Sequence, residues 1–526
     1  MTTALDPRAA DGATQARGAT SGASQRRSAL VPTGAGALFV LLATIVCVGR
    51  PDSLLNGDGD LARHLRVGAY ILQRHALFYH DVFSYTMLGK PFVPYEWLSE
   101  VLYTLAYQIG GLAGVAVLAG LIIATTYTLV TQFLSVRSVD PILAFAVGAL
   151  AAATGALHWL ARPHLFTALG AVVLLFVMEQ PGKRRLWPIV PVFVLWTNLH
   201  GGYLFGLALI CIYLVGDLAE SWLSRDQDRT EWYRRAIFDA KALGLALLAC
   251  CANPSGLELF AHVTGYFGQR YLIDHTQEYL SPTFHVFSTQ IFLGVLILVL
   301  TALALARTRP PLPHLLLVAV DLAFALYSVR NIPLFAVTAL PIVALDFDPV
   351  WRRLLASPNR LALISSAISR RFARGEAQAR LFAWPALATL VLVGAALNHG
   401  EIAGFPLVDA RFEPSVFPVA AVQRARAAHL TGRIFNEFEW GGYLLYAWPE
   451  QKVFIDGQTD LYGETLTRTY AQIVDLDPGW RDALRSWDVS LVIVPADSAL
   501  AAELEREPHW SVWYRDKTAE ILQRNG

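Results

Sequence analysis

Residues 30–64 read LVPTGAGALFVLLATIVCVGRPDSLLNGDGDLARH. The first part, Leu30 to Val48, is predominantly apolar and has about the 20 residues that a helix needs to cross the hydrocarbon core of a membrane. No small-residue cleavage site followed by a soluble domain comes after it, so we expect a retained span and not a removed signal peptide. Asp58, Asp60 and His64 follow within a short distance. The stretch therefore predicts a membrane helix that leads directly into an acidic loop at one face of the membrane.

The whole chain has the composition of a membrane protein. Of its 526 residues 55% are apolar and 16% are charged, and several further apolar runs have the length of a membrane span. This excludes a single soluble globule and predicts a mainly α, polytopic helical membrane protein. The net charge of zero argues against a nucleic-acid partner, which would require a basic excess. The four cysteines fall in apolar runs and are interpreted as buried thiols, so no disulfide framework is expected.

Basic residues between the apolar runs predict the orientation of the chain. Residues 1–29 are rich in Ala, Ser, Thr and Gly, contain arginines and are predicted to form a disordered cytoplasmic tail. By the positive-inside rule, the basic connections are cytoplasmic as well. These connections are residues 183–185, 225–241, 307–309 and 352–380. The expected location is the inner membrane of a bacterium, with the N-terminus inside.

The opposite set of connections is then expected outside. It comprises residues 51–111, 161–164, 198–202, 257–288, 329–331 and everything after about 399. The alternation closes only if the apolar segment Glu96–Ile109, which is short for a span, lies along the outer surface. This gives about eleven spans. We expect a transmembrane domain over residues 30–399 and an extracytoplasmic domain over residues 400–526.

The C-terminal 126 or so residues have the pattern of a small α/β domain. Short β-rich runs alternate with turn residues and helical segments. The predicted strands are Arg433–Phe435, Lys452–Ile455, Leu491–Val494 and Glu520–Gln523, and the predicted helices include Tyr470–Val474 and Ala499–Arg506. Trp440 and Tyr443 lie close to Asp456, which is common in carbohydrate clefts and equally common in ordinary cores.

The acidic loop is the first candidate site. A carboxylate just beyond a span suits a general base acting on an acceptor hydroxyl, and the glycines around Asp58 and Asp60 allow close approach. The alternative is that Asp60 caps a helix over Leu61–Gln73. Local residues alone favour the capping interpretation.

Polar residues at four span ends form the second candidate site. Arginine presents a fork of donors that suits phosphate oxygens, and backbone amides freed at Pro and Gly breaks also favour anions. Four such motifs at one depth, opposite the acidic loop, indicate a pocket for an anionic lipid, although any single one is more often an interfacial residue. The motifs are His158 with Arg162-Pro163-His164, Asn198 with His200-Gly201-Gly202, Asn253-Pro254, and Tyr327 with Arg330-Asn331.

A third segment, Glu258 to His285, has several histidines, tyrosines and carboxylates. It either lines a substrate groove or rests on lipid headgroups as an amphipathic helix. A divalent metal site is not favoured, because no pair of histidines is spaced one helical turn apart.

Taken together, these motifs resemble bacterial glycosyltransferase-like membrane proteins of the GT-C superfamily. The resemblance rests on Asp58-Gly59-Asp60, the Glu96-Trp97-Leu98-Ser99-Glu100 run, Ala161-Arg162-Pro163-His164, Asn198-Leu199-His200-Gly201-Gly202, Asn253-Pro254 and Arg330-Asn331, and covers about residues 30–346. It implies sugar transfer from a polyprenyl-phosphate or polyprenyl-diphosphate carrier, with Asp60 or Asp58 as base. The Glu439–Tyr443 run is loosely similar to the acceptor-binding motif of oligosaccharyltransferases but lacks its second Trp and its Asp.

The sequence therefore predicts an inverting, metal-independent glycosyltransferase that moves a sugar from a lipid-linked phosphate to the hydroxyl of a glycan or other acceptor. No cofactor is expected. Asp60 and Asp58 are the candidate catalytic residues. The candidate substrate-binding residues are Arg162, His164, His200, Arg330, Asn331, His64, Glu96, Trp440, Tyr443 and Asp456. Two rival hypotheses are a transporter or flippase of a lipid-linked anion and a catalytically silent scaffold for envelope assembly. Polar residues gathered at span ends, and not at mid-span, favour the enzyme.

Overall fold

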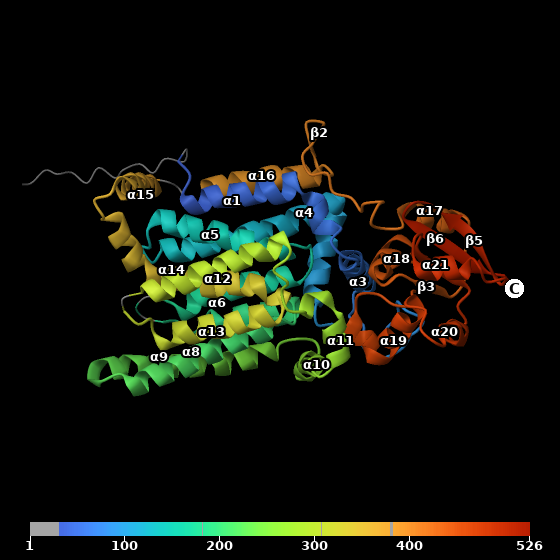
Figure 1. Ribbon diagram of the computed structural model, residues 1–526, viewed down its shortest axis with the longest axis horizontal. Helices are drawn as coiled ribbons and strands as arrows, with labels where there is room; N and C mark the ends of the chain where they lie inside the picture. The colour runs from blue at the N-terminus through green and yellow to red at the C-terminus, as the bar shows by residue number, and fades with distance from the viewer. Residues whose placement is uncertain (1–30, 181, 183, 307, 379–381, 526) are drawn as a thin grey trace, which may run out of the picture.

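A helical bundle and a small C-terminal domain make up the protein. The computed structural model describes residues 31–180, 182, 184–306, 308–378 and 382–525, so the predicted tail, Lys183, Arg307 and Arg380 lie outside the described residues. The bundle helices run roughly side by side, and the C-terminal domain packs on one end of the bundle (Figure 1). We call this the domain end and the opposite one the far end.

The bundle contains both long and short apolar helices. Its helices are α1 (Gly34–Thr44), which continues as the π-helix η1 (Ile45–Gly49), α4 (Trp97–Ser135), α5 (Pro141–Gly155) with η2 (Ala156–His158), α6 (His164–Met178), α7 (Ile189–Leu199), α8 (Tyr203–Leu223), α9 (Asp226–Cys250), α12 (Phe287–Leu305), α13 (Leu312–Tyr327), η4 (Val329–Asn331) with α14 (Ile332–Leu355), and α16 (Ala383–Leu397). Among the described residues, five helices are long and apolar enough to cross a membrane, and five shorter apolar helices accompany them. The chain is thus an integral membrane protein, and the total of about eleven spans stays a prediction.

A kink in α4 separates a helix on the bundle end from a helix inside the bundle. Gly110 and Gly111 leave helical geometry, and Gly111 has a φ of 60°, which favours glycine. A Cβ atom on Gly110 would overlap the carbonyl oxygen of Ala396 in α16. The segment before the kink lies across the domain end (Figure 1). The segment Glu96–Ile109 thus lies across an end of the bundle, and its position on the outer membrane surface stays a prediction.

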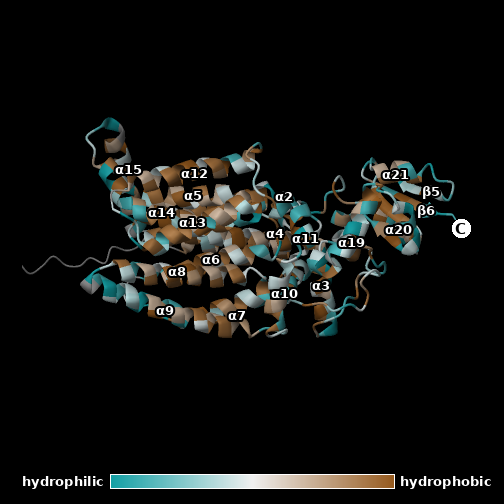
Figure 2. Ribbon diagram, turned by 60° about the horizontal axis from the view of Figure 1, so that its bottom comes forward, coloured by the Kyte–Doolittle hydropathy of each residue, from teal (hydrophilic) through white to brown (hydrophobic). Residues whose placement is uncertain are grey.

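Shorter helices cover the two ends of the bundle. At the domain end lie α2 (Pro51–Leu55), α3 (Asp60–Arg74), α10 (Glu258–Tyr266), α11 (Arg270–His275) and η3 (Gln277–Tyr279). At the far end lies α15 (Arg360–Gln378), whose exposed arginines include Arg370 and Arg374. Hydrophilic residues accordingly gather at the ends of the bundle, and hydrophobic residues dominate its length (Figure 2).

The C-terminal domain is built on a mixed sheet of four strands in the order β3-β4-β6-β5. Its strands are β3 (Ile434–Asn436), β4 (Leu491–Pro495), β5 (Trp510–Arg515) and β6 (Ala519–Arg524), with a separate hairpin of β1 (Glu401–Ile402) and β2 (Phe405–Pro406). β3 pairs parallel with β4, and the other pairs are antiparallel. The helices are α17 (Val419–Ala427), η5 (Phe438–Trp440), α18 (Gly441–Ala447), α19 (Thr459–Val474), α20 (Trp480–Ser486) and α21 (Ala499–Leu504).

Three of the four predicted strands are confirmed as β3, β4 and β6, and β5 was not predicted. The strand predicted at Lys452–Ile455 is wrong. This segment makes only an isolated bridge between Val453 and Ser84, and its hydrogen bonds go to the backbone of Phe83 and Tyr85 and to the side chain of Asn436. Its apolar side chains are buried, and Phe454 packs against Phe435 of β3, against Trp487 and against Tyr85 in the loop after α3, so burial without sheet pairing produced the β-like pattern.

Glycines allow the C-terminal domain to touch the acidic loop, residues 56–60, directly. A Cβ atom on Gly59 would overlap the carbonyl oxygen of Glu439, and one on Gly442 would overlap the carbonyl oxygen of Gly59. Helix α18 thereby lies against α3 with the two backbones in contact. The glycines of the acidic loop and of the Trp440-Gly441-Gly442 run thus form a docking contact.

We expect the domain end outside and the arginine-rich far end inside the cell. In a variant without the four native cysteines, Asp482→Cys should be labelled by an impermeant maleimide on cells with a permeabilised outer envelope. The Asp482 side chain is 77% exposed on α20. Arg374→Cys, on exposed α15, should be protected until the inner membrane is opened. The opposite labelling pattern would refute this orientation.

Candidate functional site

One guanidinium joins the two aspartates of the acidic loop. Arg162 lies in the turn between η2 and α6, where its carbonyl oxygen accepts a hydrogen bond from the Tyr103 hydroxyl at 3.1 Å. Its Nη1 is 2.9 Å from Asp58 Oδ2, and its Nη2 is 2.5 Å from Asp60 Oδ2. The predicted base and a predicted phosphate-binding residue therefore contact each other directly.

The capping interpretation of Asp60 is wrong. Helix α3 begins at Asp60 itself, with Gly59 as its N-cap residue and no side-chain cap. It is Asp58 whose Oδ1 accepts the backbone N–H of Asp60, at 3.0 Å. The Asp60 carboxylate instead points to Arg162, a partner that lies far away in the sequence.

Glu278 is a third carboxylate on the same guanidinium. Its Oε1 lies 3.3 Å from Arg162 Nη1, and its Oε2 lies 3.5 Å from His158 Nε2 and 4.0 Å from Arg330 Nη1. Although burial opposes ionisation, the charges of Arg162 and Arg330 hold the pKa of Glu278 down at about 2. Burial raises the pKa of Asp58 in spite of the opposing charge of Arg162. The arginines of the cluster therefore stay charged. Of the two carboxyl groups, Glu278 ionises more readily than Asp58.

A second arginine extends the cluster towards the start of α4. Arg330 Nη1 donates to the Tyr279 hydroxyl at 2.6 Å, and its Nη2 lies 3.3 Å from His200 Nε2. Glu96 Oε1 lies 3.6 Å from the same His200 nitrogen. Burial, with the neighbouring Glu100 charge adding to it, raises the pKa of Glu96 to about 7, so this carboxyl group titrates near neutrality.

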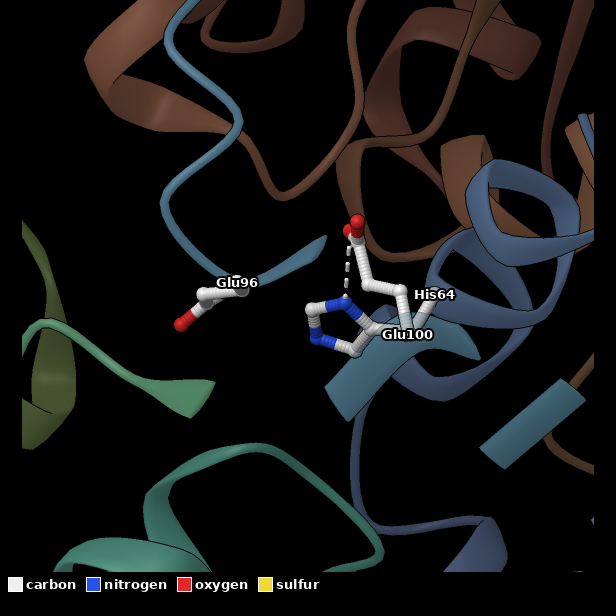
Figure 3. Close-up of side chains that lie close together, drawn as sticks. All are labelled: His64, Glu96 and Glu100. Carbon is white, nitrogen blue, oxygen red and sulfur yellow. Dashed lines mark hydrogen bonds and ion pairs between the residues drawn. The ribbon is translucent and has the colours of Figure 1, made fainter. Parts of the chain in front are cut away.

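A buried ion-pair network lies behind the cluster. Arg63 Nε is 3.4 Å from Asp456 Oδ1, and Arg63 Nη1 is 3.6 Å from Glu100 Oε1, which also lies 3.3 Å from His64 Nδ1. One possible ligand atom from each of His64, Glu96 and Glu100 lies within 4.8 Å of the other two, which is close enough for the three to hold a metal ion. Figure 3 shows the bond from His64 to Glu100, and no interaction is drawn to Glu96. Because Arg63 already supplies a cation at Glu100, this network holds α3, α4 and the C-terminal domain together.

The C-terminal domain closes over the aspartates. Glu439 Oε2 accepts the Gly59 N–H at 3.3 Å, and a Cβ atom on Gly457 would overlap Asp60 Oδ1. Although Glu439 keeps contact with solvent, desolvation of its carboxyl group and then the charges of Asp60 and Asp58 raise its pKa to about 7. The domain therefore adds a titrating carboxyl group beside the acidic loop.

Several predicted site residues lie elsewhere. Trp440 donates its indole N–H to the carbonyl of Val416, and Tyr443 stacks on Phe417, as the core interpretation of this pair describes. Asn331 donates to the carbonyl of Phe324 in α13 and has no side-chain bond to the cluster among the described residues. His164 Nε2 lies 2.9 Å from the carbonyl oxygen of His158, behind Arg162.

The site residues predicted from the sequence do not include Glu278, Tyr279 or Glu439, which the structure brings to the cluster. Their carboxylates and hydroxyl were visible in the sequence, but no spacing connects them to Arg162 or Arg330. Thr167 was also not predicted. Its hydroxyl lies 2.7 Å from His200 Nδ1, but the residue stands in the apolar run of α6, and no neighbouring polar residue in the sequence indicates a role at the site.

Two open pockets are lined by residues other than Arg162 and its carboxylate partners. One of about 420 Å³ lies beside Trp97, Asn198 and Pro254, on the outside of α4 and α7. Another of about 330 Å³ lies where the loop after α3, α10 and the C-terminal domain meet, beside the ion pair of His262 with Asp460 at 2.8 Å. Both lie at the domain end.

Comparison with known proteins identifies the fold. No protein-family model matches the chain, and no curated protein matches it. The solved oligosaccharyltransferase of Archaeoglobus fulgidus in the apo form is 12% identical with a TM-score of 0.57, over 88% of this chain and 69% of that chain. The archaeal oligosaccharyltransferase AglB from Archaeoglobus fulgidus, in complex with an inhibitory peptide and a dolichol-phosphate, gives a TM-score of 0.54 at 12% identity over 88% of this chain and 69% of that chain. A form tethered to an acceptor peptide gives 0.53 at 11% identity. The chain thus has a fold similar to that of the archaeal oligosaccharyltransferase.

Proposed function

We propose that this protein is a glycosyltransferase that moves a sugar from a polyprenyl-phosphate carrier to an acceptor hydroxyl at the outer face of the cytoplasmic membrane. The observation that carries the proposal is the pairing of Asp58 and Asp60 with Arg162 at the end of the bundle. A base and a phosphate-binding group are both required, and here they are adjacent. The likeness to an enzyme solved with a dolichol-phosphate supports the carrier class.

In the proposed reaction Asp60 accepts the proton of the acceptor hydroxyl. The acceptor oxygen bonds to the anomeric carbon from the face opposite the phosphate. The bond from that carbon to the phosphate oxygen breaks, and polyprenyl phosphate leaves with the electron pair. Arg162 and Arg330 stabilise the charge that develops on this leaving group. The mechanism is inverting, and the metal-independent form stays a prediction.

Arg162 has to change partners for this reaction to proceed. As long as its guanidinium contacts Asp60, the ion pair makes the carboxylate a weak base. An arriving phosphate competes for the same donors, because the planar guanidinium matches the spacing of phosphate oxygens as well as that of carboxylate oxygens. Donor binding would therefore release Asp60 at the moment when a base is required.

A transporter of a lipid-linked anion is the rival, and one observation favours it. The expectation that polar groups lie only at span ends is wrong, because Asp321 lies in the middle of α13, is 1% exposed and accepts a hydrogen bond from Thr338. Such intramembrane carboxyl groups mark ion pathways in pumps and transporters. If Asp321→Asn abolished lipid transport in vesicles while Asp60→Asn did not, the transporter would replace the enzyme.

Asp60→Asn should keep the fold and reduce sugar transfer by about two to four orders of magnitude, because an amide cannot accept the proton. Transfer would be measured from a panel of synthetic decaprenyl-phosphate sugars in nanodiscs. Asp58→Asn should cost less, since Asp58 also orients the backbone of Asp60. Full activity in both single variants and in the double variant would exclude a base in the acidic loop.

Arg162→Lys should raise the donor Kd and lower the Tm of the protein. Lysine is a point charge that cannot bridge the three carboxylates around Arg162, and each lost charged hydrogen bond costs about 1–3 kcal/mol. The measurements are the donor Kd and the Tm. Arg481→Lys, on an exposed ion pair of the C-terminal domain, is the matched control and should change neither. Equal behaviour of the two variants would leave Arg162 without a special role.

Donor binding should weaken as the pH rises through about 7. Glu96, whose pKa is raised to about 7, is neutral below this pH and negatively charged above it. Its charge lies 3.6 Å from His200 Nε2 and would repel an anionic donor. Glu96→Gln should therefore flatten the alkaline side of the profile of donor KM against pH. Identical profiles for the variant and the wild type would contradict this effect.

A further inference from the structure

His200 is held by hydrogen bonds on one side of its ring. The residue follows α7 directly, and its side chain is 9% exposed. Its Nδ1 lies 2.7 Å from Thr167 Oγ1 in α6 and 3.1 Å from the backbone nitrogen of Gly202. Trp196 Nε1 donates to the same threonine oxygen at 2.9 Å.

These contacts determine which ring nitrogen carries the proton. A backbone N–H can only donate, so Nδ1 must accept from Gly202 and cannot itself be protonated. Thr167 Oγ1 accepts from Trp196, which leaves its own hydrogen to be donated to Nδ1. The remaining proton is therefore on Nε2. Burial and then the charge of Arg330 lower the pKa of His200, which keeps the ring neutral.

On the other side of the ring, two donors meet without an acceptor between them. His200 Nε2–H and Arg330 Nη2 are 3.3 Å apart, and both carry hydrogens. The nearest carboxylate oxygen, Glu96 Oε1, is 3.6 Å from Nε2, beyond ordinary hydrogen-bond distance. One oxygen atom of an anion, placed between the two nitrogens, would accept from both.

This arrangement explains why residue 202, in the His200-Gly201-Gly202 run, is a glycine. A Cβ atom on Gly202 would overlap Thr167 Oγ1 and crowd His200 Nδ1. Only glycine lets the amide reach the imidazole at this position. The run therefore serves to orient one side chain, which explains a sequence feature that the proposed reaction leaves without a role.

We infer that His200 and Arg330 form a subsite for a phosphate oxygen, and that Thr167, Trp196 and Gly202 position His200 as its neutral Nε2–H donor. The lipid carrier as the source of this phosphate rests on the proposed function. Free phosphate presents the same oxygens, so the experiment has to separate the two sources. Thr167 is a positioning residue, because it acts only through the ring of His200.

The test compares the binding of decaprenyl phosphate, decaprenol and inorganic phosphate to the purified protein in nanodiscs. Thr167→Val removes the hydroxyl at almost constant volume and should weaken phosphate binding about fivefold to tenfold, the order expected for one hydrogen bond. Thr167→Ser should restore most of this loss. Thr197→Val is the matched control. Thr197 is buried in α7, its hydroxyl makes no hydrogen bond among the described residues, and its replacement should have no effect.

A second measurement reads the tautomer without any substrate. Nitrogen-15 NMR of histidine-labelled protein, with His200 assigned by its loss in His200→Gln, should show a protonated Nε2 and an unprotonated Nδ1. Because the Gly202 N–H remains, Thr167→Val should keep this tautomer but shift the resonance of the unprotonated Nδ1, which loses one of its two hydrogen bonds, whereas Thr197→Val should not. A packing defect alone would not move this signal.

The outcomes separate the subsite from the enzyme. An Nδ1–H tautomer in the wild type, or unchanged phosphate binding in Thr167→Val and His200→Gln, would overturn the subsite even if sugar transfer were demonstrated. Binding of decaprenyl phosphate that depends on Thr167, in a protein that transfers no sugar, would support the subsite and refute the enzyme. Binding of inorganic phosphate alone would support the subsite and exclude the lipid source.

Discussion

The contact of Arg162 with Asp58, Asp60 and Glu278 is the interaction on which the arrangement of the domain end depends. The four side chains are 17–22% exposed, so none of them is fully hydrated. Removing the guanidinium of Arg162 leaves Asp58 and Asp60 without their cation, at a cost of about 3–5 kcal/mol. The three carboxylates come from two separate parts of the chain, at the start of α3 and after α11. The guanidinium thus fixes the acidic loop and the segment 277–279 relative to the start of α6.

The C-terminal domain depends on this arrangement because it docks by its backbone. Gly59 in the acidic loop and Gly442 in α18 bring two main chains into contact, and the ion pair of Arg63 with Asp456 fastens α3 to the same domain. A backbone contact tolerates little displacement, since no flexible side chain can adjust to it. Movement of the acidic loop would therefore be transmitted to Glu439 and to the loop around Gly457. For this reason, access to Asp60 and the position of the domain are coupled.

The sequence predicted what depends on periodicity and on local geometry. The apolar runs predicted the helical bundle, and the short run before Gly110 was correctly placed along the end of the bundle, because a helix of that length is too short to cross. The errors concern partners that lie far apart in the sequence. Asp60 has the residue type and position of a helix cap, and only the fold brings Arg162 to it. Lys452–Ile455 has the pattern of a strand, but side chains buried in a core without sheet pairing give the same pattern. Glu278 and Tyr279 lie in a segment whose two interpretations the sequence left open.

The polarity of the site explains why it lies at the end of the bundle and is still shielded from water. Within the hydrocarbon region each unpaired charge would be expensive, whereas in open water the arginines would bind an anion only weakly, since Coulomb attraction falls with the dielectric constant. The segment of α4 before its kink and the C-terminal domain cover the cluster from two sides, which removes water without surrounding the charges by lipid. The cluster in turn supplies the partners that make such burial tolerable. Residues on either side, such as Glu96 and Glu439 with pKa values raised to about 7, then lie at the boundary where a small change in charge alters the binding of an anion. A carrier whose tail stays in the membrane and whose phosphate reaches this boundary would find its two halves in the two environments that suit them.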